Sequence, residues 1–66
     1  MTITVNDQSQ NIPDGTTVMG LLTLLGLKPQ ATVVQHNGDV LDRDQYPATA
    51  LREGDVLELV RFVGGG

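Results

Sequence analysis

The stretch Thr17–Gly26, TVMGLLTLLG, decides the fold because it predicts the single helix against which the rest of the chain must pack. Four apolar residues recur at the i, i+3, i+4, i+7 spacing of one helix face, namely Val18, Leu21, Leu22 and Leu25. Thr17 is suited to the N-cap, and Gly26 to the left-handed residue that ends a helix. Gly20 costs a helix interior about 1 kcal/mol relative to alanine, so packing must hold this short helix in place.

Segments with the polar–apolar alternation of strands lie on both sides of this helix. Five strands are predicted, at Thr2–Asn6, Gln10–Ile12, Thr32–Asn37, Val40–Leu41 and Val56–Phe62. An Asn37-Gly38 turn joins the third strand to the fourth, and Arg52–Asp55 turns the chain into the last. The segment Asp42–Leu51 has no clear repeat and is predicted to be a loop with a helical turn. This order predicts an α+β fold in which one helix covers one face of a mixed sheet.

The composition describes one small domain with an aliphatic core. A chain of 66 residues buries only about 60% of its unfolded surface, which leaves little room for an internal active site. The sequence has one Phe, one Tyr and no Trp. It also has no Cys, which excludes disulfides, thiolate metal ligands and Cys nucleophiles and is consistent with a cytoplasmic location.

The charge and hydropathy of the chain argue against two classes of partner. The net charge is −4, and the four cations are Lys28, Arg43, Arg52 and Arg61. Nucleic-acid binding needs a basic cluster, so we expect no nucleic-acid partner. No signal peptide follows Met1 and no apolar run approaches spanning length, so we expect no membrane partner either. An acidic chain is instead suited to docking on a basic protein surface.

The residues that could carry catalysis or bind a metal are isolated from one another. His36 is the only His, and a metal site needs several convergent ligands, so His36 is interpreted as a surface or strand residue. Three aspartates lack the spacing of a calcium loop and are assigned to a solvated loop, namely Asp39, Asp42 and Asp44. Glu53 and Asp55 are interpreted as ordinary turn residues, and Tyr46 as a turn anchor at the rim of the core. We expect no catalytic residue and no metal site.

The sequence Val63-Gly64-Gly65-Gly66 follows the last predicted strand. Glycine has no Cβ and adopts positive and negative φ with similar ease, so its backbone can approach another surface closely. A glycine-rich terminus can therefore pass through a narrow channel and present its carboxylate to an enzyme. The alternative is a frayed terminus without function.

The last predicted strand also offers a docking surface. Alternation places Leu57 and Leu59 toward the core and the other residues on the opposite face, namely Val56, Glu58, Val60 and Phe62. In the third strand, we expect Val34 to point inward and Val33 outward. An apolar patch beside the tail indicates a partner site, which we assign to Val33, Val60, Phe62 and Val63. The alternative is a strand buried on both faces, or a Phe62 ring folded over the sheet edge.

The order of these motifs resembles the β-grasp sulfur-carrier proteins, and the ThiS type of bacterial thiamine biosynthesis in particular. The shared features are the opening hairpin, Gly15-Thr16-Thr17-Val18 before a Leu-Leu helix, the Asn37-Gly38 turn, Gly54-Asp55 before the last strand, and the glycine ending. The small subunit of molybdopterin synthase is also similar, but it is usually longer and has a proline-containing segment just before its Gly-Gly, where this chain has Arg61-Phe62-Val63 and no proline. The resemblance implies a ubiquitin-like β-grasp domain at 1–62, with a four- to five-stranded mixed sheet on one helix, and a flexible tail at 63–66.

The resemblance further implies a carrier and not an enzyme. In this family a partner enzyme uses ATP to adenylate the C-terminal carboxylate, here that of Gly66, and a sulfur-donor protein converts it to a thiocarboxylate. Thiazole synthase then accepts the sulfur. Gly64 and Gly65 would let the terminus reach into the partner, and the carrier itself would bind no cofactor. The alternatives are a sulfur carrier for molybdopterin, a ubiquitin-like protein modifier, and a β-grasp interaction module.

Overall fold

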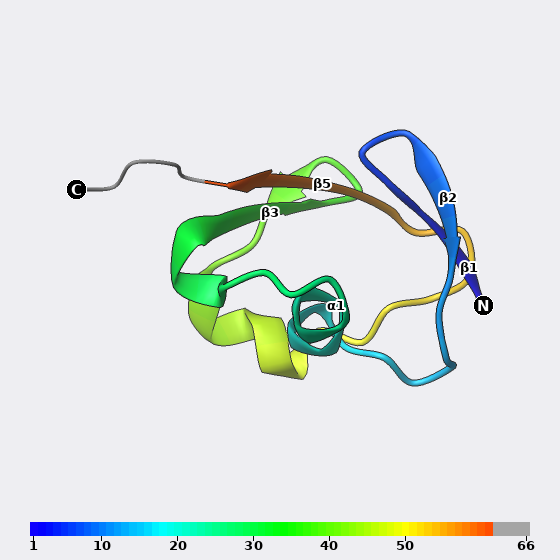
Figure 1. Ribbon diagram of the computed structural model, residues 1–66, viewed down its shortest axis with the longest axis horizontal. Helices are drawn as coiled ribbons and strands as arrows, with labels where there is room; N and C mark the ends of the chain where they lie inside the picture. Colours follow the sequence, from blue (N-terminus) through cyan, green and yellow to red (C-terminus); the bar gives the residue numbers. More distant parts are fainter. Residues whose placement is uncertain (62–66) are drawn as a thin grey trace.

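The computed structural model describes residues 1–61, which form a five-stranded sheet with the helix α1 across one face (Figure 1). The strands are β1 (Thr2–Val5), β2 (Gln8–Asn11), β3 (Thr32–His36), β4 (Asp39–Val40) and β5 (Val56–Arg61). The helices are α1 (Val18–Leu24) and two 3₁₀ segments, η1 (Pro29–Ala31) and η2 (Arg43–Ala48). α1 and η2 lie on the same side of the sheet, and no element within residues 1–61 covers the other side (Figure 1). The predicted α+β class and β-grasp architecture are confirmed.

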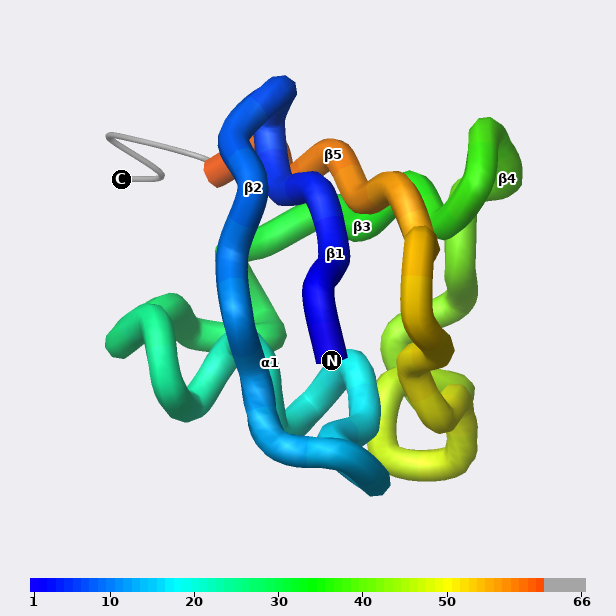
Figure 2. The backbone as a smooth tube through the Cα atoms, turned by 90° about the vertical axis from the view of Figure 1, so that its right-hand side faces the viewer, coloured from blue at the N-terminus to red at the C-terminus, as the bar shows by residue number. Residues whose placement is uncertain are grey.

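The strand β5 lies in the middle of the sheet, although it comes last in the described chain. The strand order is β2-β1-β5-β3-β4 (Figure 2). β5 pairs in parallel with β1 and antiparallel with β3, and the two outer pairs are antiparallel hairpins. The C-terminal end of β5 therefore lies between β1 and β3, and the residues of β5 that point away from α1 lie in the middle of the outer face of the sheet.

The helix α1 begins and ends as its sequence predicts. The Thr17 hydroxyl accepts a hydrogen bond from the Gly20 amide at 3.1 Å, which satisfies one free N–H of the first turn. At the other end Gly26 has φ +70°, a left-handed conformation that glycine adopts without strain. The Leu27 amide donates to the Leu22 carbonyl and the Gly26 amide to that of Thr23, which together form a Schellman cap. These bonds fix both ends of a helix of only seven residues.

Among residues 1–61, the core is aliphatic except for one tyrosine. The buried apolar side chains are Ile3, Val5, Ile12, Val18, Leu21, Leu22, Val34, Tyr46, Leu51, Leu57 and Leu59, and Leu25 packs at their edge. The placement of Tyr46 at the rim was wrong, because its side chain is 2% exposed. Its hydroxyl donates to the Thr32 carbonyl at 2.9 Å, so the one polar atom of the ring is satisfied inside the core.

The first hairpin is tighter than the sequence pattern predicts. The second strand runs from Gln8 to Asn11 and not over Gln10–Ile12, because the connection is the two-residue turn Asn6-Asp7. Both turn residues have positive φ, +49° and +68°, as a type I′ hairpin turn requires. Ile12 lies beyond the strand and is buried in the core.

The burial pattern of α1 yields a stability prediction. Leu22→Ala and Leu59→Ala should each lower the free energy of unfolding by about 2–5 kcal/mol, because each leaves a cavity in a small core. Leu24→Ala should change it by less than about 0.5 kcal/mol, since Leu24 is 61% exposed. Urea denaturation followed by circular dichroism measures all three. A loss for Leu24→Ala as large as that for Leu22→Ala would contradict the assigned helix face.

Candidate functional site

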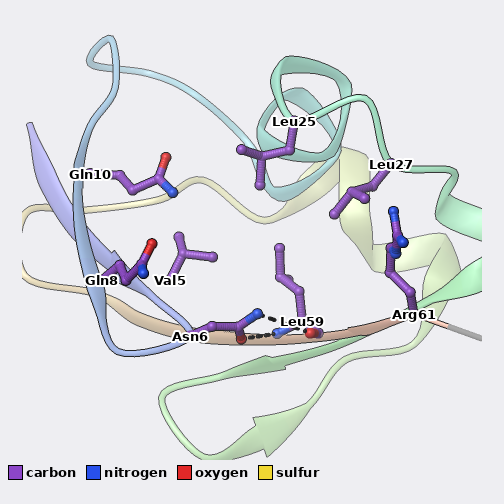
Figure 3. A pocket seen from close by; sticks show the side chains of 8 residues that line it. All are labelled: Val5, Asn6, Gln8, Gln10, Leu25, Leu27, Leu59 and Arg61. Carbon is purple, nitrogen blue, oxygen red and sulfur yellow. Dashed lines mark hydrogen bonds between the residues drawn. The ribbon is translucent and has the colours of Figure 1, made fainter.

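The end of β5 is held by the side chain of Asn6. The Leu59 amide donates to Asn6 Oδ1 at 2.9 Å, and Asn6 Nδ2 donates to the Leu59 carbonyl at 3.2 Å (Figure 3). The backbone pairing of β1 with β5 ends nearby, with the Asn6 amide bonded to the Leu57 carbonyl at 3.0 Å. The chain turns away from β5 after β1, so β1 supplies no backbone partner for Leu59. The Asn6 side chain bonds to the Leu59 amide and carbonyl in its place. On the other side of β5, pairing with β3 continues to Arg61, opposite Thr32.

The outer face of the sheet, on the side away from α1, exposes apolar side chains close to this end. Val60 is 55% exposed and lies directly opposite the half-buried Val33. Leu57 and Leu59 are buried on the helix side, and Val34 is fully buried, so the predicted alternation of both strands is confirmed within the described residues. The structure therefore brings Val33 and Val60 together as the start of an exposed patch.

Two further valines extend this patch. Val56, which alternation had placed on the same face without a role, is 47% exposed. Val40 is 63% exposed and pairs with Gln35, so it also belongs to the outer face. Sequence reasoning missed Val40, because its face depends on the register of the β3–β4 hairpin. Four of the exposed or half-buried valines thus share one face, namely Val33, Val40, Val56 and Val60.

The remaining predicted site residues lie outside the described part of the chain. These are the proposed contact residues Phe62 and Val63 and the tail glycines Gly64, Gly65 and Gly66. The structure describes the chain up to Arg61, the last residue of β5, and so fixes the point from which these residues continue.

A groove of about 420 Å³ lies on the helix side of the sheet, beside the same end of β5 (Figure 3). Its lining residues are Val5, Asn6, Gln8, Gln10, Leu25, Leu27, Leu59 and Arg61. The leucines and Val5 form an apolar floor, while the two glutamines and Arg61 bring polar groups to its rim (Figure 3). Its lining offers no carboxylate, imidazole or hydroxyl group that could serve as a nucleophile or general base.

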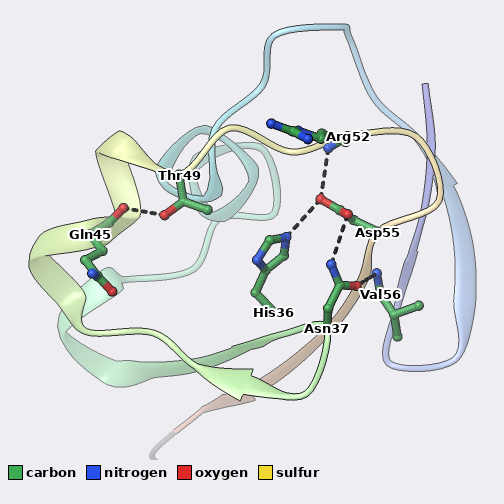
Figure 4. A network of polar contacts seen from close by, with 7 residues as sticks. All are labelled: His36, Asn37, Gln45, Thr49, Arg52, Asp55 and Val56. Atoms are coloured by element: carbon green, nitrogen blue, oxygen red, sulfur yellow. Dashed lines mark hydrogen bonds and ion pairs between the residues drawn. The ribbon is translucent and has the colours of Figure 1, made fainter.

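Asp55 is the centre of a polar network at the start of β5 (Figure 4). Its interpretation as an ordinary turn residue was wrong, because Asp55 is 8% exposed. Its carboxylate contacts His36 Nε2 at 2.9 Å and accepts from Asn37 Nδ2 at 3.1 Å and from the Arg52 amide at 2.9 Å. Asn37 Oδ1 in turn accepts from the Val56 amide at 2.9 Å. The network ties the β3–β4 turn to the turn before β5.

The surroundings of Asp55 stabilise its charged form. Burial acts to raise the pKa of Asp55, but the hydrogen bonds from His36, the Arg52 amide and Asn37, together with the charge of His36, outweigh burial and hold it below its usual value. His36 and Asp55 are two groups only, and residues 1–61 contain no set of three His, Cys, Asp or Glu side chains placed to hold a metal. The hydrogen bonds of the network connect the start of β5 to the β3–β4 turn.

Residues 1–61 also contain no helix that combines the length and apolar character needed to cross a bilayer. A mixed five-stranded sheet with one helix across it defines this chain as a β-grasp protein, and valines are exposed on the outer face of its middle strand.

Comparison with known proteins identifies the family. Residues 1–66 match the ThiS family. The sulfur carrier protein ThiS of Bacillus subtilis is 34% identical over 53 residues, which are 80% of this chain and 80% of that protein. The crystal structure of the thiamine biosynthesis protein ThiS from Geobacter metallireducens has a TM-score of 0.85 and 33% identity, with 100% of both chains covered. The chain belongs to the ThiS family.

A second kind of relative is a much longer protein. A thiazole synthase of Magnetococcus marinus is 42% identical over 66 residues, which are 100% of this chain and 20% of that protein. The chain likewise spans 20% of a thiazole synthase of Paramagnetospirillum magneticum, at 33% identity. The chain therefore covers about a fifth of the length of these relatives.

The Asp55 network yields a prediction about acid stability. A carboxyl whose folded-state pKa lies below its unfolded value stabilises the fold above the unfolded value, near pH 3.9, and loses that contribution as pH falls through the folded pKa. At pH 7, Asp55→Asn should lower the free energy of unfolding by about 1–3 kcal/mol, because the donors around Asp55 lose a charged acceptor. This difference from the wild type should shrink as the pH falls below about 4.

Urea denaturation at a series of pH values measures this difference. Asp44→Asn is the matched control, since Asp44 is exposed and should show almost no difference at any pH. A difference for Asp55→Asn that stays constant from pH 7 to pH 2 would contradict the lowered pKa of Asp55.

Proposed function

We propose that the chain is a cytoplasmic sulfur carrier in thiamine biosynthesis. In this proposal the Gly66 carboxylate is adenylated, converted to a thiocarboxylate, and used as the sulfur source for a thiazole synthase. The observation that carries the proposal is the match of residues 1–66 to the ThiS family. The apolar outer face at the end of β5 supports it, because a carrier must dock on the enzymes that modify it.

The chemistry explains why the carboxylate must be activated. A carboxylate is a poor electrophile because its negative charge repels nucleophiles, whereas transfer to AMP creates a good leaving group. Gly66 leaves the acyl carbon unhindered, and Gly64 and Gly65 let it enter an active site. The sequence has no Cys, so sulfur cannot be carried on a side-chain thiol, and we assign it to the C-terminal carboxylate.

The catalytic groups belong to the partners in this proposal. An ATP-dependent adenylating enzyme would bind the triphosphate and its metal ion and would supply the electrostatic stabilisation of the reaction. A sulfur-donor protein would then supply the sulfur. The carrier would contribute its terminus and its docking surface, with no bound cofactor and no catalytic residue of its own.

We place the docking surface on the outer face of the sheet. Val33 and Val60 lie opposite each other there, and we assign Phe62 and Val63 to the same surface by continuation of the sequence. Exposed aliphatic side chains gathered on one face gain free energy when a partner covers them.

The thiazole synthase partner is supported by the longer relatives. In Magnetococcus marinus, a protein named thiazole synthase contains a segment similar to the whole of this chain. For the present chain we propose that a thiazole synthase is the partner that accepts the sulfur.

The proposal predicts that the terminus is essential. In a protein that ends at Gly66, deletion of Gly65 and Gly66 should abolish sulfur transfer without lowering the free energy of unfolding, because the residues that form the core lie before them. Addition of one residue after Gly66 should be equally damaging, since the carboxylate of Gly66 is then blocked. Activity is measured as ATP-dependent sulfur incorporation in the presence of the adenylating enzyme and a sulfur donor.

Mass spectrometry of the C-terminal peptide must locate the sulfur. Replacement of one oxygen by sulfur has nearly the same mass effect as sulfoxide formation at Met1 or Met19. Reaction with a thiol-directed alkylating agent separates the two, because a chain without Cys offers no other thiol. ATP-dependent labelling that persists after deletion of Gly65 and Gly66 would sink the proposal, and isopeptide adducts on other proteins would indicate a protein modifier.

The docking surface has a prediction of its own. Val60→Ser and Phe62→Ser should each weaken binding to the adenylating enzyme about tenfold, while the free energy of unfolding changes by less than about 1 kcal/mol. Leu24→Ser is the control, because Leu24 is equally exposed but lies on α1. Isothermal titration calorimetry measures the affinity. Unfolding of Phe62→Ser would instead place Phe62 in the core, and equal losses for Leu24→Ser and Val60→Ser would contradict the assigned face.

A further inference from the structure

A single charged residue lies in the middle of the apolar outer face. Glu58 is exposed on β5, the central strand, with Val56 before it and Val60 after it on the same face. Directly opposite Glu58, on β3, is the exposed Gln35. Gln35 pairs in turn with Val40 of β4. Glu58 and Gln35 therefore form a polar pair bordered by exposed valines along β5 and across the sheet.

No group of the described chain neutralises this carboxylate. The ion pairs within residues 1–61 join Met1 to Asp14 and His36 to Asp55, and none involves Glu58. None of the four Lys and Arg residues of the sequence is a strand residue of the outer face. Arg61 lies opposite the buried Thr32 and lines the groove on the helix side, while the other three lie outside the strands, namely Lys28, Arg43 and Arg52.

This arrangement constrains any partner that covers the valines. Such a partner removes water from Glu58, and a desolvated carboxylate without a counterion costs several kcal/mol. Glu58 lies between Val56 and Val60, so a purely apolar partner surface that covered both valines would also pay the desolvation free energy of the Glu58 carboxylate. A partner that places a cation against Glu58 avoids the penalty and also fixes the register in which it docks.

We propose that Glu58 and Gln35 form the receiving position for an arginine side chain of the adenylating enzyme; the identity of this partner rests on the proposed function. The guanidinium group is planar and can donate two parallel hydrogen bonds to the Glu58 carboxylate. Its further N–H donors can reach the side-chain oxygen of Gln35, and its flat faces can pack on the neighbouring valines. A lysine ammonium offers neither the bidentate geometry nor the flat faces.

A charge-reversal experiment tests the position. Glu58→Lys should weaken binding to the adenylating enzyme at least about tenfold, and Glu58→Gln about threefold, because loss of the charge is milder than repulsion. Asp44→Lys is the matched control, since it changes the net charge equally but lies on η2, at the helix side of the sheet. It should weaken binding less than about twofold. Circular dichroism and urea denaturation of the free variants verify that each remains folded.

A compensating change in the partner identifies the arginine. Replacement of one enzyme arginine by glutamate should weaken binding of the wild-type carrier and restore binding of Glu58→Lys. If Glu58→Lys and Asp44→Lys weaken binding equally, the arginine position proposed here is wrong. The proposed function still holds in that case, provided that the wild-type carrier binds the enzyme and is activated with ATP. Absence of both binding and activation for the wild type would instead overturn the proposed function, and the assigned partner with it.

Discussion

The position of β5 in the middle of the sheet is the constraint on which the rest of the structure depends. It is the last described strand, yet it pairs with β1 on one side and β3 on the other. Its inner residues Leu57 and Leu59 complete the core beneath α1, and its outer residues stand exposed on the opposite face. Because side chains alternate along a strand, the same segment supplies residues to the core and to the exposed face. The described chain ends with this strand, at Arg61.

Two polar side chains, Asp55 and Asn6, fix the ends of β5 through hydrogen bonds that join distant parts of the sequence. At its start, the buried carboxylate of Asp55 gathers donors from His36, Asn37 and the Arg52 amide. Near its end, Asn6 forms two hydrogen bonds with the backbone of Leu59. The strand is thereby held in register at both ends, although its parallel pairing with β1 is short. A fixed strand gives the outer face a defined shape, which lowers the entropic cost of docking.

The sequence predicts the features that depend on local periodicity. Residues close together in the sequence determine the inward and outward faces of α1 and β5. The same is true of the N-cap Thr17 and of Gly26, which ends the helix. The features it misses depend on contacts between distant segments. Asp55 reads as a turn residue until the fold brings His36 and Asn37 to it, and Val40 has no assigned face until the β3–β4 register is known. The buried Tyr46 hydroxyl donates to the Thr32 carbonyl, a partner 14 residues away that local periodicity does not indicate.

In the function proposed above, partners dock on the outer face of β5 and not on the helix. Methyl cross-saturation NMR tests it most directly, with the Val and Leu methyl groups of the carrier labelled and the bound adenylating enzyme irradiated. Docking on this face predicts strong saturation transfer to the methyls of Val60 and Val33 and none to Leu24, which is exposed on α1 and serves as an internal control. Strong saturation transfer to Leu24 with none to Val33 and Val60 would contradict docking on the outer face.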